Sequence, residues 1–145
     1  MATIDLPNNI LEALSTVLQQ LQQSLPEVKQ APDFSAIAFK WENGELKAIH
    51  QLKRIEFNDL KGIERQKEKV LQNTEQFLNG LPANDVLLTG SRGTGKSSIV
   101  RALLTEYAEQ GLRLIEIERD DLSELPEIQN LIAERPEKFI VYCDD

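Results

Sequence analysis

Apolar residues recur at intervals of three and four near the start of the chain, at positions 10, 11, 14, 17, 18, 21 and 25. This spacing predicts an amphipathic helix with one apolar stripe. Pro7 suits the first turn of that helix and Pro26 suits its end. Glutamines occupy the opposite side, as on a solvated helix face. The pattern leaves open whether the stripe packs against the chain's own domain or against a partner chain.

After this helix, apolar residues alternate with smaller or polar ones, a period of two instead of the helical spacing. Phe39 and Trp41 alternate with smaller or polar residues, Asn43-Gly44 supplies a turn, and a second run returns over 46–52. These features predict a β-hairpin. Trp41 and His50 lie within it and are assigned structural roles, because a lone histidine without a second ligand is weak evidence for a metal.

The rest of the chain alternates between helical and extended patterns. The predicted elements are a helix over 63–78, a strand over 86–89, a helix over 97–110, a strand over 112–118, a helix over 126–134 and a strand over 139–143. Gly80 and Gly111 follow the first two of these helices, where glycine commonly ends a helix. Strands and helices in this order predict an α/β fold with a parallel sheet and crossover helices.

The predicted strands differ in polarity. Residues 86–88 and 139–141 are continuous apolar runs, which suit the covered centre of a parallel sheet. The strand over 112–118 contains Arg113, Glu116 and Glu118. We therefore expect this strand at an edge of the sheet.

The composition is that of a globular protein, with 41% hydrophobic and 28% charged residues. The length of 145 residues accommodates about one domain, or a small appendage joined to part of a larger one. A formal net charge of -8 without a clustered basic patch predicts that nucleic acid is not a partner. The chain has one cysteine and no apolar run near the roughly 18 residues that cross a bilayer, so we expect a cytoplasmic protein with no membrane contact.

The most specific motif follows the strand predicted over 86–89. Residues 90–97 match the phosphate-binding (Walker A) pattern G-x-x-x-x-G-K-[ST]. Its glycines allow backbone N–H groups to surround an anion at the positive end of the next helix. We expect Lys96 to reach the β- and γ-phosphates of ATP and Ser97 to present its hydroxyl to Mg²⁺. The predicted ATP-binding residues are Gly90, Ser91, Arg92, Gly93, Thr94, Gly95, Lys96, Ser97 and Ser98.

A dinucleotide-binding fingerprint is the alternative interpretation of the same glycines. Gly93-Thr94-Gly95 begins a G-x-G-x-x-G pattern, but Ser98 stands where the third glycine is required. The alternative therefore fails.

A second motif lies at the end of the last predicted strand, where an apolar run leads into Asp144 and Asp145. Ligands of parallel sheets bind at the carboxyl ends of the strands. We expect Asp144 to join Ser97 in holding Mg²⁺. Asp145 is expected to orient or deprotonate the attacking water, as a catalytic residue together with Lys96. The Asp120-Asp121 pair is assigned to helix capping rather than to a second metal site.

These motifs resemble those of the AAA-type ATPases, and in particular of a group of bacterial ATP-binding proteins in that class. The resemblance covers roughly residues 37–145 and is carried by the phosphate loop, its additional glycine at Gly93, and the segments 59–67, 81–84 and 142–145. It implies that residues 60–63 border the adenine and that Gly62 allows close approach of the backbone. The family's strand usually ends in Asp-Glu, so the shorter Asp145 implies a change in the placement of the attacking water and in the rate of hydrolysis.

The resemblance also implies how the chain is divided. Residues 1–30 form the amphipathic helix, residues 31–58 a linker and β-hairpin, and residues 59–145 the N-terminal part of an AAA-type ATPase domain, truncated after the second acidic motif. Two further strands, a polar sensor residue, an arginine finger and a helical lid are expected beyond residue 145. One of those strands belongs between the two apolar strands of this chain. The expected fold class is therefore an incomplete P-loop NTPase sheet, preceded by a helix and a hairpin.

The leading functional hypothesis is Mg-ATP binding and hydrolysis, coupled to a conformational change in an unidentified protein partner or in a homo-oligomer that assembles through the missing regions. One alternative is an ATP-binding switch with little hydrolysis. Another is an inactive fragment of a longer ATPase. A phosphotransferase would require an acceptor pocket that the sequence does not identify, and a GTPase is disfavoured because no Asn-Lys-x-Asp motif is present.

Overall fold

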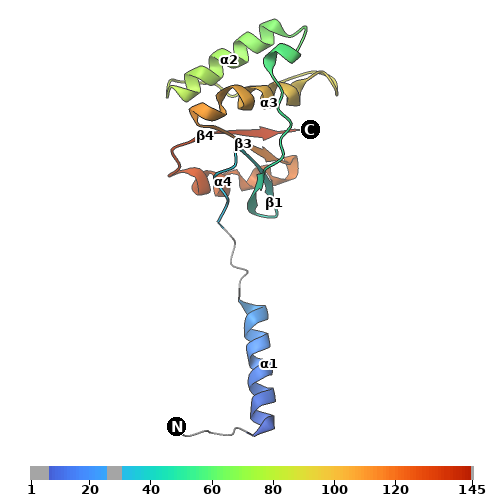
Figure 1. Ribbon diagram of the computed structural model, residues 1–145, viewed down its shortest axis with the longest axis vertical. Coiled ribbons are helices and arrows are strands. Elements are labelled where there is room, and N and C mark those ends of the chain that lie inside the picture. Colours follow the sequence, from blue (N-terminus) through green and yellow to red (C-terminus); the bar gives the residue numbers. More distant parts are fainter. Residues whose placement is uncertain (1–6, 26–30, 145) are drawn as a thin grey trace. The chain divides into compact units, whose positions relative to one another are not determined.

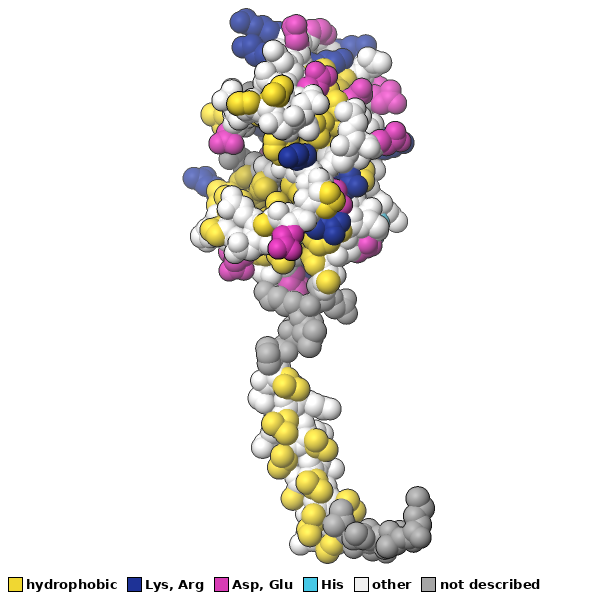
Figure 2. Space-filling model, turned by 90° about the vertical axis from the view of Figure 1, so that its left-hand side faces the viewer, with side chains coloured by type: hydrophobic (Ala, Val, Ile, Leu, Met, Phe, Trp, Pro, Cys, Tyr) yellow, Lys and Arg dark blue, Asp and Glu magenta, His cyan; other side chains and the backbone are white. Residues whose placement is uncertain are grey.

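The computed structural model describes residues 7–25 and 31–144 of a chain that divides into two compact units, Met1–Ala31 and Pro32–Asp145 (Figure 1). In the first unit, α1 spans Asn8–Ser24 with Pro7 at its N-cap, as the apolar spacing predicts. The apolar stripe of α1 is exposed, and Figure 2 shows its side chains gathered along one side of the helix. Pro26, expected at the end of this helix, lies outside the described residues. Within the described ranges, no helix is both long enough and apolar enough to cross a bilayer.

The second unit is built on a four-stranded sheet with the strand order β2-β1-β3-β4. Its elements are β1 (Ala38–Glu42), β2 (Glu45–Ile49), η1 (Phe57–Asp59), α2 (Glu64–Leu78), α3 (Lys96–Tyr107), η2 (Ala108–Gln110), β3 (Leu112–Ile117), η3 (Arg119–Glu124), α4 (Leu125–Ile132) and β4 (Lys138–Cys143). β1 pairs antiparallel with β2, whereas β1 with β3 and β3 with β4 are parallel pairs. The predicted α/β class with a mostly parallel sheet is confirmed, and the arrangement is consistent with an incomplete P-loop fold.

The predicted hairpin forms at the predicted turn. Asn43 and Gly44 have φ angles of 55° and 72°, and Trp41 pairs with Leu46 directly across the two strands. Two turn residues with positive φ match the twist of a tight hairpin, which explains the Asn-Gly pair. The second strand ends at Ile49, so it is shorter than predicted. Through β1, the hairpin belongs to the same sheet as β3 and β4.

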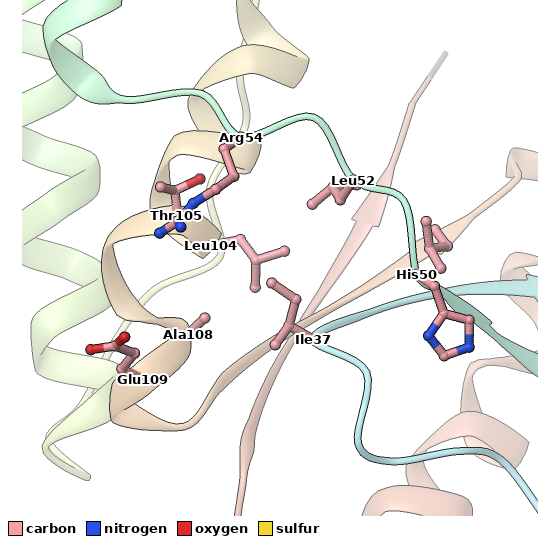
Figure 3. A pocket seen from close by; sticks show the side chains of 9 residues that line it. Ile37, His50, Leu52, Arg54, Leu104, Thr105, Ala108 and Glu109 are labelled. Carbon is pink, nitrogen blue, oxygen red and sulfur yellow. The ribbon is translucent and has the colours of Figure 1, made fainter.

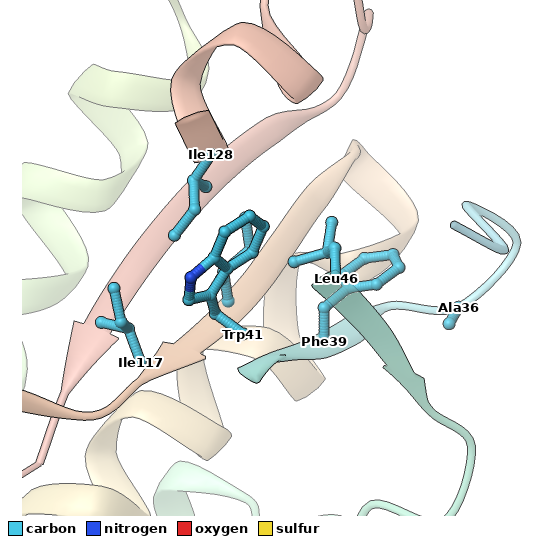
Figure 4. Close-up of a cluster of buried hydrophobic side chains, with 7 residues drawn as sticks. Ala36, Phe39, Trp41, Leu46, Ile117 and Ile128 are labelled. Carbon is cyan, nitrogen blue, oxygen red and sulfur yellow. The ribbon is translucent and has the colours of Figure 1, made fainter. Parts of the chain in front are cut away.

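Helices cover both faces of the sheet. On the face covered by α4, the buried core residues are Ala36, Phe39, Trp41, Leu46, Ile115, Ile117 and Ile128 (Figure 4). On the face covered by α3, Val100 and Leu104 pack against Ala38 of β1 and Leu114 of β3. This packing fixes α3, whose first residue is Lys96 of the predicted phosphate loop, on the middle of the sheet.

The predicted positions of two strands are wrong. β3, expected at an edge because of its charged residues, lies between β1 and β4. Its apolar residues are buried, whereas Arg113 and Glu116 are only half-buried. β4, expected at the covered centre, pairs with β3 alone among the described residues, and its Val141 is 37% exposed. The difference arises because β1 pairs with β3 from a distant part of the chain, and local polarity does not encode that pairing.

The strand predicted over 86–89 does not form. Val86 is 51% exposed and Leu87 is 87% exposed, while Leu88 alone of this run packs against the core under α3. A strand requires a hydrogen-bonded neighbour, and no segment of residues 31–144 pairs with the outer edge of β4. Without such a neighbour among the described residues, the apolar run stays outside the sheet.

Candidate functional site

The predicted phosphate loop leads directly into α3. Gly95 is the N-cap of this helix with φ 90°, and Gly93 has φ 85°. Side chains with a Cβ rarely adopt such angles, so the backbone of the loop requires glycine at both positions. Buried residues on α3 hold its first turn against the sheet. The positive end of the helix dipole therefore lies at residues 90–95.

Gly90 is required for a different reason, which is a close contact inside the loop. A Cβ at this position would lie 2.7 Å from Thr94 Oγ1. Thr94 is itself held in place, because its backbone N–H and its hydroxyl donate to the carbonyl oxygen of Ser91 over 3.3 and 2.8 Å. The three glycines of the motif thus allow one compact turn.

Lys96 lies over this turn. Its Nζ donates to the carbonyl oxygens of Gly90 and Ser91 over 2.6 and 3.1 Å. The positive charge is thereby held at the mouth of the loop, in the place where the motif predicts a phosphate-binding lysine. Arg92 is exposed near the middle of the loop, and Ser98 is half-buried in the first turn of α3.

The structure brings the two predicted metal ligands together. Ser97 Oγ donates to Asp144 Oδ2 over 3.3 Å, although the two residues are 47 positions apart in the sequence. Ser97 Oγ also lies 3.1 Å from the hydroxyl oxygen of Tyr142. The predicted juxtaposition of the phosphate loop and the end of the last strand is therefore present.

Tyr142 is a site residue that the sequence reasoning did not single out. Burial raises the pKa of its hydroxyl, the hydrogen bond with Ser97 lowers it, and a hydrogen bond with the Asp144 carboxylate and the charge of that carboxylate raise it. The hydroxyl consequently keeps its proton at neutral pH. A usable signal was present in the sequence: residues two apart on a strand face the same side, so Tyr142 shares the side of Asp144.

Hard oxygen atoms are the ligands that Mg²⁺ prefers, and the Ser97 hydroxyl and the Asp144 carboxylate supply two of them. Among the residues that the structure describes, no three His, Cys, Asp or Glu side chains gather as a metal-binding group. The protein atoms thus fit an ion that completes its shell with water and phosphate oxygens, rather than an ion enclosed by protein alone.

Other predicted site residues lie elsewhere or outside the described part. Asp145 is not among the described residues. Leu60 and Ile63 pack against the core beneath α2 and α3, while Gly62 is exposed with φ 75°. Asp120-Asp121 lie in the first turn of η3, whose N-cap is Glu118 and which has no side-chain capping bond, so their predicted capping bond is absent.

Two pockets of about 330 and 580 Å³ lie away from the phosphate loop. The smaller one, shown in Figure 3, is lined by β2, the segment that follows it and the second half of α3. Arg54 and Thr105 line both pockets, and no residue of 90–98 lines either. Residues 90–94 of the candidate phosphate site are exposed and lie at the N-terminus of α3.

Comparisons with known proteins agree with part of this picture. Residues 34–145 match the model of a protein family described as "Protein of unknown function (DUF815)". Over 51 residues, 35% of this chain, the sequence is 35% identical to the replication factor C large subunit of Methanococcus maripaludis, and the match covers 11% of that protein. The chain thus spans about a tenth of that curated relative's length. No solved structure matches the chain.

These matches suggest an AAA-type relation over part of the chain. They do not support the expectation that nucleic acid is not a partner, because the curated relative is named for replication.

Proposed function

The chain belongs to the family of unknown function DUF815, and we propose that within this family it acts as a Mg-ATP-binding module of the AAA type that hydrolyses ATP. The observation that carries the proposal is the meeting of Ser97 and Asp144 beside Lys96 at the N-terminus of α3. Each of these residues is assigned a role in nucleotide binding by its own motif. Their meeting across 47 positions of sequence is what a shared ligand would require.

Lys96 and the N-terminus of α3 would bind the phosphates. The ammonium group now donates to two loop carbonyl oxygens, and phosphate oxygens would replace these as acceptors. The dipole of α3 favours an anion at the same place. Charge-assisted hydrogen bonds are stronger than neutral ones, so Lys96 is expected to contribute most of the side-chain affinity for the β- and γ-phosphates.

Ser97 and Asp144 would hold the Mg²⁺ that accompanies ATP. When bound, the ion would neutralise charge on the phosphates. In the protein, the carboxylate of Asp144 accepts a hydrogen bond from the Ser97 hydroxyl and so orients it. This arrangement leaves a lone pair of Ser97 Oγ for the ion.

Hydrolysis would use Asp145 to orient the attacking water. Its side chain is one methylene shorter than the glutamate usual in the resembled family, which favours slow turnover. An ATP-binding switch with little hydrolysis is therefore the second candidate function. Single-turnover hydrolysis by the wild type and by Asp145→Asn distinguishes the two: a rate that the substitution does not change indicates the switch.

The proposed binding of ATP would act on other molecules. We infer that nucleotide binding is coupled to a conformational change in a protein partner or in an assembly of several copies, because the AAA-type relation points to such assemblies. Analytical ultracentrifugation with and without Mg-ATP tests whether copies of this chain associate.

Calorimetric titration with Mg-ATP tests the binding proposal, using the wild type, Lys96→Ala and a matched Lys53→Ala control. Lys53 is also a lysine, but it is exposed and lies outside the loop. Saturable binding by the wild type and the control, lost in Lys96→Ala, is expected. Circular dichroism confirms that all three proteins are folded. Absence of binding by a folded wild type, or undiminished binding by Lys96→Ala, contradicts the proposal.

A further inference from the structure

The hydroxyl of Tyr142 lies beside both residues that are proposed to hold Mg²⁺, and it has no role in the proposed function. Tyr142 belongs to β4 and stands two residues before Asp144. Its hydroxyl oxygen lies 3.1 Å from Ser97 Oγ of α3 and is also hydrogen-bonded to the Asp144 carboxylate. Because Ser97 donates to Asp144 over 3.3 Å, the three side chains form one closed cluster.

Packing holds the ring of this tyrosine in place. Tyr142 is half-buried and packs against a cluster that includes Val100 and Leu104 of α3 and Leu114 of β3. Asp144, by contrast, is exposed and follows the last residue of β4. An exposed side chain keeps its rotamer freedom unless specific bonds restrict it. The Tyr142 hydroxyl is therefore a fixed point to which the exposed carboxylate is bonded.

The bond from Tyr142 leaves the Asp144 carboxylate able to bind an ion. An ionised carboxylate only accepts hydrogen bonds, so the tyrosine is the donor. The two carboxylate oxygens provide about four lone-pair positions, and the bonds from Tyr142 and Ser97 occupy only part of them. In the contact between Ser97 and Tyr142, either hydroxyl can donate. The cluster thus orients Asp144 without filling its coordination positions.

A carboxylate that is already oriented binds a metal ion more tightly, because less rotamer freedom is lost when the ion arrives. Groups that hydrogen-bond to a metal ligand act in this way, and their removal weakens metal binding. We propose that Tyr142 is a positioning residue that holds the Asp144 carboxylate beside Ser97 Oγ and thereby strengthens the binding of Mg²⁺ with ATP. This inference rests on the proposed Mg-ATP function and adds a residue to its metal site.

Tyr142→Phe removes the hydroxyl and keeps the packed ring. Calorimetric titrations measure ATP affinity in saturating Mg²⁺ and in EDTA, and the ratio of the two affinities measures what the metal adds. In Tyr142→Phe this ratio is expected to fall about fivefold, which corresponds to the roughly 1 kcal/mol of one hydrogen bond. Affinity in EDTA is expected to stay unchanged, whereas a merely structural role would lower it as well.

Tyr107→Phe is the matched control. It also removes one tyrosine hydroxyl, which donates to Glu75 Oε1 over 2.8 Å between α2 and α3. Its affinity ratio is expected to equal that of the wild type. In an Asp144→Ala background, Tyr142→Phe is expected to lose its effect, because the carboxylate that the hydroxyl holds is gone. Circular dichroism confirms that each variant is folded.

The outcomes separate this inference from the proposed function. If the folded wild type binds no Mg-ATP, the proposed function fails and this inference fails with it. If the wild type binds and Tyr142→Phe leaves the affinity ratio unchanged or raises it, only this inference is overturned. A fall of the same size in Tyr107→Phe, or one that persists in the Asp144→Ala background, would also overturn it.

Discussion

Two regions of the second unit differ in how much of their apolar surface is buried: the inner strands β1 and β3, and residues 86–89 just before the phosphate loop. Phe39 and Ile115 are 0% exposed, whereas Val86 and Leu87, just before the loop, are 51% and 87% exposed. The residues proposed to bind ATP thus come directly after the less buried of these two regions in the sequence. Regions with few buried contacts open locally at low free energy. We infer that the inner strands supply the stability and that the segment leading into the phosphate loop is free to respond to a ligand.

Among the substitutions that test this comparison, Trp41→Ala is expected to lower the free energy of unfolding the most. The indole is 1% exposed, packs between the sheet and α4, and donates its N–H to Glu124. Removing a buried aromatic ring leaves a cavity and costs about 3–5 kcal/mol in the free energy of unfolding. Urea unfolding followed by circular dichroism measures this change. Trp41→Phe, which keeps a ring, is expected to lose less, and equal losses in the two variants would contradict the cavity explanation.

A pair of identical substitutions tests the contrast between the inner strands and the segment before the loop directly. Leu114 is 2% exposed on β3, and Leu87 is 87% exposed. Leu114→Ala is expected to lower the free energy of unfolding by about 2–5 kcal/mol. Leu87→Ala is expected to change it by less than about 0.5 kcal/mol. Comparable losses measured by urea unfolding would show that the segment before the loop is buried in solution, and the contrast would fail.

Substitutions of two glycines extend this comparison to the binding of Mg-ATP. Gly90→Ala would place its Cβ against Thr94 Oγ1 and distort the loop, so affinity for Mg-ATP is expected to fall about tenfold. Gly111→Ala, where a Cβ meets nothing within 4 Å but φ is 93°, is expected to lower stability by about 1 kcal/mol and to leave affinity unchanged. Calorimetric titration and urea unfolding of both variants measure these effects. The reverse result would contradict the placement of the ATP-binding loop at residues 90–95.

The smallest effect is a dependence of stability on pH at the α4 end of the sheet. Arg135 donates to Glu137 over 2.7 Å and holds the pKa of that carboxyl below its ordinary value of 4.5. A carboxyl with a lowered folded pKa contributes stability above its unfolded pKa, and this contribution is lost as the pH falls below about 4.5. In the Arg135→Gln variant, the melting temperature is expected to fall less steeply as the pH decreases through this acidic range. An unchanged acid profile would mean that the pair contributes nothing measurable.

Local sequence signals predicted the parts of the structure that depend on neighbouring residues. Asn43-Gly44 identified the hairpin turn, and helical spacing identified α1, α2 and α3 close to their observed ends. The meeting of Ser97 with Asp144 could also be predicted, because a P-loop and an acidic strand end imply one common ligand.

The errors concern positions set by distant partners. Nothing local in residues 112–118 indicates that β1 covers their second edge, and the apolar run at 86–89 looks the same with or without a neighbouring strand. Tyr142 was missed because its hydroxyl matters only once β4 is placed beside α3. Strand order and side-chain neighbours across a sheet are non-local properties, so a sequence pattern alone leaves them undetermined.

The pairing of β1 with β3 also determines the order in which the molecule can fold during synthesis. Trp41 donates to Glu124, 83 residues later in the chain. The hairpin therefore leaves the ribosome long before β3 and α4 exist to cover it, with its apolar face uncovered during that interval. Long-range pairings of this kind slow folding and expose nascent chains to aggregation. Burial of the single tryptophan should consequently be a late event, one that reports completion of the whole sheet.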